Sequence, residues 1–111
     1  MDDQERAETY REFSEAVNMT PRELEHWLDT AESREVGAKS SDRSESVGHA
    51  SGRRILDIKH TKKSELTDAE YAHMRTVVGY VHRHLAQRPT GDVRETRWRY
   101  SLMNWGHDPL K

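Results

Sequence analysis

One stretch, Leu66–Arg88, constrains the fold more than any other, because the sequence marks both ends of a single long helix there. Thr67 is followed three residues later by Glu70, the spacing of a capping box at a helix start. Pro89 follows the stretch and cannot continue a helix. Such signals predict one helix of several turns.

The same stretch carries an apolar stripe at helical spacing. Its members recur every three or four residues: Tyr71, Met74, Val78, Val81 and Leu85. Leu66 and Tyr71 also occupy the two positions of a hydrophobic staple around the cap. A second face is small and basic, with Arg75, Gly79 and Arg83. A third face holds His73, Val77, Tyr80 and His84.

Other segments also show helical signals, and none shows the alternation of a strand. Helices are expected over Glu5–Val17, from Thr20 onward, over Arg53–Lys63 and after Asp92. The second has Thr20 as N-cap and Pro21 at the first helical position. Glu23, three residues after Thr20, completes a capping box. The third could begin as early as Ser46, which would place Val47 beside Ile55 and Ile58. For the last, Asp92 and Glu95 provide the expected cap, and Gly106 the expected end.

The sequence therefore predicts an all-α fold, a single compact domain of four to five helices with a long loop rich in Gly and Ser. The expected domain spans residues 1–111, with residues 1–4 and 37–48 flexible. Only 32% of the chain is hydrophobic and its mean hydropathy is -1.10, so the core must be thin. The predicted core residues are Leu24, Trp27, Leu28, Ile55, Ile58, Met74, Val78, Val81, Leu85, Trp98 and Tyr100.

Composition also narrows the classes of function. The chain has no Cys, which excludes disulfides and thiol chemistry. It has no apolar run of the roughly 20 residues that span a bilayer, so a cytoplasmic protein without membrane contact is expected. No two of its seven His have the i,i+4 spacing of a helical zinc site. No phosphate-binding Gly motif is present either, and we expect neither enzymatic activity nor a cofactor or metal.

Charge is distributed unevenly along the chain. Residues 1–35 hold eleven Asp or Glu and four Lys or Arg, a net charge of 4 − 11 = −7. Residues 36–111 hold nine and fourteen, a net charge of 14 − 9 = +5. Three interpretations are open: an acidic helix that screens a basic surface, a basic surface that binds a polyanion, or two solvated faces that differ only in sign.

Basic residues concentrate on the third and fourth expected helices, which a short turn of four residues would join in a helix-turn-helix outline. The candidate nucleic-acid-binding residues are Arg53, Arg54, Lys59, Lys62, Lys63, Arg75 and Arg83. Gly79 would allow a close approach, either of a phosphate backbone or of another helix whose acids pair with Arg75 and Arg83. If DNA binds, backbone contacts without sequence preference are expected, and alanine at Arg53, Arg54, Lys62 and Lys63 should weaken all duplexes alike.

The C-terminal region places Trp98, Tyr100 and Trp105 among arginines. These rings could anchor the core or stack on single-stranded bases. The alternative to DNA binding is a protein–protein interaction module that uses the acidic first helices and the Ser-rich loop. Its partner, like the oligomeric state, is left open by the sequence.

Three motifs in order carry a resemblance to a known family: SVGHASGRRI, YAHMRTVVGYVHRHLAQRP and WRYSLMNWGHDPLK. Over almost all of residues 10–111 the chain resembles the small helical proteins of Domain of Unknown Function 3140, found in bacteria, archaea and fungi. The resemblance implies no defined activity and no catalytic residues. Some members carry a DNA-binding description, which adds weight to the polyanion hypothesis.

Overall fold

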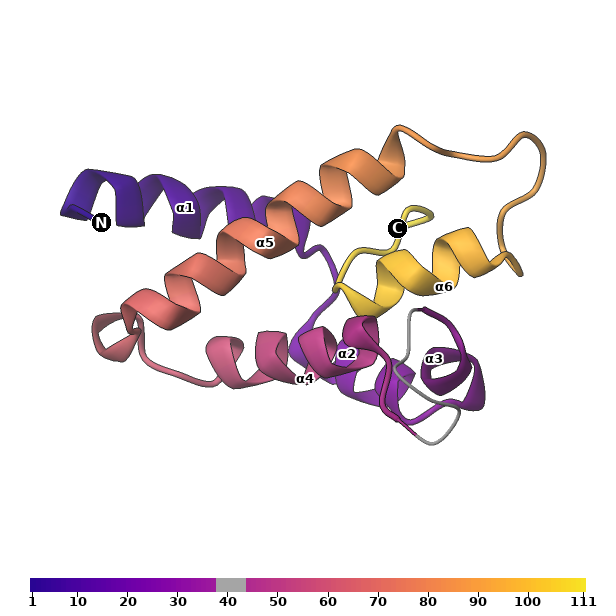
Figure 1. The fold of residues 1–111 in the computed structure, drawn as a ribbon, viewed down its shortest axis with the longest axis horizontal. Helices are drawn as coiled ribbons and strands as arrows, with labels where there is room; N and C mark the ends of the chain where they lie inside the picture. Colours follow the sequence, from indigo (N-terminus) through magenta and orange to yellow (C-terminus); the bar gives the residue numbers. More distant parts are fainter. Residues whose placement is uncertain (38–43) are drawn as a thin grey trace.

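The computed structural model describes residues 1–37 and 44–111, and within these ranges the chain is all-α. No strand occurs in the described residues (Figure 1). The helices are α1 (Asp3–Ala16), α2 (Pro21–Leu28), α3 (Ala31–Glu35), α4 (Val47–Lys59), α5 (Asp68–Leu85) and α6 (Arg97–Asn104), with a short 3-10 turn, η1, at Lys63–Glu65.

The helices form two groups that share α5. In Figure 1, α1 and α5 pack against each other and cross at an angle. The second group contains α2, α4 and α6, with the short α3 packed against α6. Because α5 contacts α1, α4 and α6, it belongs to both groups.

The core lies along both sides of α5 and continues between α2, α4 and α6. All predicted core residues are buried except Leu85 and Tyr100, which are partly buried and pack on the core. Val77, expected on a different face from the stripe, is also fully buried. The buried surface of α5 therefore extends beyond the predicted stripe, because α1 covers one side of the helix and α6 covers another.

Local capping explains where α2 and α5 begin. The Thr20 hydroxyl accepts the Glu23 N–H, and the Glu23 carboxylate accepts the Thr20 N–H at 2.8 Å. At α5, the Glu70 carboxylate accepts both the N–H and the hydroxyl of Thr67, each at 2.9 Å. Both predicted capping boxes are confirmed.

The third expected helix has one of its two predicted starts, but it ends four residues before the predicted Lys63. It begins at Val47 with Ser46 as N-cap, the earlier of the two predicted starts, and ends at Lys59. Val47 was expected beside Ile55 and Ile58, but its side chain is 61% exposed and lies outside the core. The buried face in the N-terminal half of α4 is formed by small residues instead. Gly48 and Gly52 lie there against Asn104 and Trp105, at the C-terminal end of α6.

The last helix also begins later than predicted. Thr96, not Asp92, is the N-cap of α6 and accepts the Arg99 N–H. The Asp92 carboxylate instead accepts the Arg94 N–H within a turn that follows Gly91, whose φ is +86°. The predicted end is confirmed, with Gly106 at φ +82° just after the helix.

Two further expectations concern the loop and membrane contact. Half of the predicted Gly- and Ser-rich loop of residues 37–48, namely residues 38–43, lies outside the described residues, so its predicted flexibility is untested. Residues 47 and 48, included in the expected loop, belong to α4. None of the helices in the described ranges combines the length and apolar character that a membrane crossing requires.

Candidate functional site

Several of the candidate basic residues make contacts within the fold. Arg53 pairs with Glu45, and its Nε donates to a carboxylate oxygen at 2.7 Å. The Arg53 contact, with help from His49, lowers the pKa of Glu45 to about 2. Lys59 lies over the Phe13 ring at 5.1 Å, and burial lowers its pKa. Lys63 lies over the Tyr10 ring at 4.7 Å.

On α5, Arg75 contacts α1 rather than solvent alone. Its Nε donates to the Thr9 hydroxyl at 3.3 Å, and its Nη2 lies 3.4 Å from a Glu5 carboxylate oxygen. Arg83 folds back over Gly79, with Nη1 2.9 Å from the position that a Cβ at residue 79 would occupy. The space at Gly79 is therefore filled by this arginine, and not by another helix.

The remaining candidates are Arg54, Lys62 and Arg83, which are exposed and have no ion-pair partner among the described residues. Arg83 lies apart from Lys62. Lys62 precedes α5, whereas Arg83 is near its far end, about 22 Å along the axis from Asp68 at 1.5 Å per residue. The predicted four-residue turn is also wrong, since residues 60–67 and a 3-10 turn separate α4 from α5.

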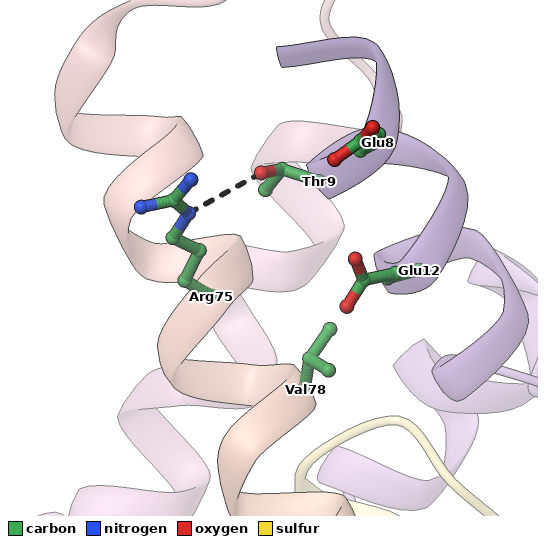
Figure 2. Close-up of a pocket in the computed structure, with 5 residues that line it drawn as sticks. All are labelled: Glu8, Thr9, Glu12, Arg75 and Val78. Carbon is green, nitrogen blue, oxygen red and sulfur yellow. Dashed lines mark hydrogen bonds between the residues drawn. The ribbon is translucent and has the colours of Figure 1, made fainter. Parts of the chain in front are cut away.

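A pocket lies between α1 and α5, with a volume of about 280 Å³ (Figure 2). Its lining residues are Glu8, Thr9 and Glu12 of α1, and Arg75 and Val78 of α5. In the close-up, Arg75 reaches across to Thr9, while the carboxylates of Glu8 and Glu12 lie along the α1 side. Neither carboxylate has an ion-pair partner within residues 1–37 and 44–111.

Sequence reasoning missed this pocket. Glu8 and Glu12 are one helical turn apart on an acidic helix, and that spacing does place them on one face. The groove they border depends on Val78 and Arg75, which are more than sixty residues away in the sequence. No local signal connects these positions.

Trp98 of α6 and Trp105, which directly follows the helix, are core residues and not a free stacking platform. Trp98 and Trp105 are 8% and 6% exposed. Trp105 stacks on Tyr80 with ring centroids 4.3 Å apart, and Trp98 stacks on His84 at 5.9 Å. Of the two predicted roles, the core anchor therefore describes these two tryptophans.

Asn104 is a buried residue whose role the sequence did not reveal. Its side-chain oxygen Oδ1 accepts the Trp27 indole N–H at 2.8 Å and the Ser33 hydroxyl. Its amide donates to the Ser33 carbonyl at 3.0 Å. A Cβ on Gly52 would lie 2.7 Å from the main-chain carbonyl oxygen of Asn104, so α4 and α6 approach closely here.

Ser51 and His73 form a hydrogen-bonded pair between α4 and α5, with Oγ and Nε2 3.0 Å apart. Burial and the nearby Arg54 charge lower the pKa of His73. Ser51 is only 3% exposed, and no described carboxylate bonds the other ring nitrogen. We therefore assign the pair a packing role. Over the described residues, no group of three or more His, Asp or Glu gathers as metal ligands would.

Comparison with known proteins gives one match. The family model described as "Protein of unknown function (DUF3140)" matches residues 12–103, most of the chain. No curated protein and no solved structure matches. The chain belongs to the DUF3140 family.

Proposed function

We propose that this domain is a protein-interaction module that binds a basic segment of a partner in the pocket between α1 and α5. The observation that carries the proposal is the pair of unpaired carboxylates, Glu8 and Glu12, beside the apolar side chain of Val78. A lysine or arginine of a partner could pack its aliphatic stem on Val78 and place its charged head between the carboxylates.

The charge of α1 supports the same proposal. Residues 2–16 hold six Asp or Glu and two Arg, and the acidic side chains of α1 are exposed. Such a surface attracts cationic partners and speeds their association at low salt. Arg75 is the cation inside the pocket, and it is already bonded to Thr9 and close to Glu5.

The test is fluorescence anisotropy with a short labelled lysine-rich peptide. The change is Glu8→Gln with Glu12→Gln, which keeps side-chain size and removes both charges. We expect peptide affinity to fall roughly threefold or more, since each exposed ion pair contributes about 0.2–1 kcal/mol. The matched control is Glu25→Gln with Glu32→Gln, which removes the same charge from α2 and α3 and should leave affinity nearly unchanged. If the two variants lost peptide affinity equally, the net charge of the protein would explain the loss, and the proposed pocket would be contradicted.

Weak, largely sequence-independent DNA binding is the second candidate, and the exposed cations Arg54, Lys62 and Arg83 support it. Anisotropy with a labelled random duplex at low and moderate salt tests it. If these residues contact phosphates, changing all three to Gln should abolish binding, and affinity should fall with salt by about 0.9 log units per log salt for each contact. If DNA does not bind even at low salt, this candidate is wrong.

A further inference from the structure

A second pocket lies at the N-terminal end of α4, away from the acidic pocket of α1. Its volume is about 280 Å³, slightly below the roughly 300–1,000 Å³ typical of sites for drug-sized ligands. Its walls include Val47 and Gly48 of α4, Tyr80 of α5, and Ser101, Asn104 and Trp105 at α6. Most of this wall is aromatic or aliphatic, and the polar groups are few.

The indole N–H of Trp105 is a donor without an acceptor in this pocket. Trp105 is 6% exposed, and a buried indole N–H usually has a hydrogen-bond partner. The other two tryptophans follow that rule, because Trp27 donates to Asn104 and Trp98 donates to the His84 carbonyl at 2.7 Å. No acceptor for Trp105 Nε1 occurs among the described residues.

Gly48 leaves this donor accessible. A Cβ at residue 48 would lie 3.1 Å from Trp105 Nε1, closer than ordinary van der Waals contact. Trp105 Nε1 is also not fully enclosed by protein atoms. In the described part of the chain, the fully enclosed side-chain nitrogen or oxygen that lacks a partner is Arg6 Nε. The absence of a side chain on Gly48 therefore keeps Nε1 open to the pocket.

The first turn of α4 adds further donors. Ser46 Oγ accepts the His49 N–H at 3.0 Å, which satisfies one amide of the helix start. The N–H groups of Val47 and Gly48 have no acceptor among the described residues. In a helix of 13 residues they lie at the positive end of the helix dipole, where anions bind favourably. Glu45, the nearest acid in sequence, is turned toward Arg53 and His49.

We propose that this pocket binds a small organic carboxylate. Its two oxygens accept hydrogen bonds from the Trp105 indole and from the first-turn amides of α4, and the Ser101 hydroxyl lies on the same wall. Its apolar body packs against Val47 and the stacked rings of Tyr80 and Trp105. The proposal is independent of the protein-interaction function, because none of the lining residues is shared with the pocket of α1.

The three indole N–H groups make the proposal testable by NMR with ¹⁵N-labelled protein. Benzoate is the probe, and benzamide and inorganic phosphate are the comparison ligands. We expect benzoate to shift the Trp105 indole proton downfield as it gains an acceptor, while the Trp27 and Trp98 indoles stay near their starting positions. A response to benzamide as strong as that to benzoate would overturn the requirement for an anion. An equally strong response to phosphate would overturn the role of the apolar body.

Two variants locate the site. Gly48→Ala places a methyl group against Nε1, improves helix propensity, and should weaken benzoate binding at least tenfold. Val47→Glu adds a competing carboxylate at an exposed position and should weaken binding similarly. The matched control is Gly79→Ala, the same change in a helix away from the pocket, which should bind as the unmodified protein does. Retained binding in both pocket variants, or no shift of the Trp105 indole, would overturn the proposal.

Discussion

Two glycines within helices of this protein meet very different surroundings. A Cβ on Gly52 would lie 2.7 Å from the Asn104 carbonyl oxygen and 2.7 Å from a methyl carbon of Leu28. A Cβ on Gly79 would meet only the far end of the Arg83 side chain, at 2.9 Å. A backbone oxygen cannot move aside without shifting α6, whereas a surface guanidinium can.

These surroundings predict opposite effects of the same substitution. Gly52→Ala should lower the free energy of unfolding by about 1–3 kcal/mol, the usual range for overpacking a core. Gly79→Ala should raise it by about 0.5–1 kcal/mol, because alanine favours the helix and Arg83 can swing away. Urea denaturation monitored by circular dichroism measures both. If Gly52→Ala proved as stable as the parent, the close contact between α4 and Asn104 would be contradicted.

Asn104 shows what single-residue reasoning could not predict. The burial of Trp27 was predictable from its place on an amphipathic helix, but its hydrogen-bond partner was not. Asn104 and Ser33 are separated from each other by 71 residues, and each is an ordinary polar residue in its local sequence. Only the packing of α3 against α6 makes them a buried pair.

At the scale of helices, local capping was the most reliable predictor. The Thr20 box at α2 depends on residues three apart, and the fold reproduces it. The Glu23 carboxylate also accepts a hydrogen bond from the Lys111 ammonium. This contact, together with the Thr20 N–H, lowers the pKa of Glu23 to about 2. The start of α6 was mispredicted because the Asp92 carboxylate accepts the Arg94 N–H in a turn before the helix, and Thr96 caps the helix instead. Sequence spacing alone does not distinguish these two roles for Asp92.

The α2 cap gives a prediction at this scale. Thr20→Ala removes the hydroxyl that accepts the Glu23 N–H and should lower the free energy of unfolding by about 1 kcal/mol. The matched control is Thr76→Ala on the exposed side of α5, where the hydroxyl bonds only to the Ala72 carbonyl of its own helix. That control should be neutral or slightly stabilising. Thermal unfolding compares the two, and equal losses would show that the cap contributes nothing specific.

At the scale of the whole molecule, the fold redistributes the charge pattern of the sequence. Arg75 meets an acid of α1, Arg53 is neutralised by Glu45, and Lys59 and Lys63 pack on aromatic rings of α1. The basic segment of the sequence is thus only partly a basic surface. The net charges of the two halves were compatible with an acidic helix that screens a basic surface, but they could not predict which pairs would form, since those depend on how the helices pack.

The C-terminal segment closes the molecule onto the loop between α1 and α2. Asn18 and Asp108 exchange two hydrogen bonds: the Asn18 amide donates to the Asp108 carbonyl at 2.9 Å, and the Asp108 N–H donates to the Asn18 side-chain oxygen at 2.8 Å. Nearby, His107 Nδ1 donates to the Ala16 carbonyl at 2.7 Å, and the Met19 N–H donates to the Gly106 carbonyl at 3.1 Å. The GHDPLK end of the chain therefore holds α1 against the rest of the fold.

A double-mutant cycle tests this connection. Asn18→Ala should lower the free energy of unfolding by about 1–3 kcal/mol in the full chain, because two hydrogen bonds of about 0.5–1.5 kcal/mol each are lost. In a chain that lacks residues 108–111, the same substitution should cost almost nothing, because its partner is already gone. A chain that lacks only residues 109–111 keeps Asp108 and serves as the control, in which Asn18→Ala should retain most of its effect. If Asn18→Ala cost the same in all three chains, Asn18 would stabilise the loop locally, and the C-terminal segment would not be what joins the two ends of the molecule.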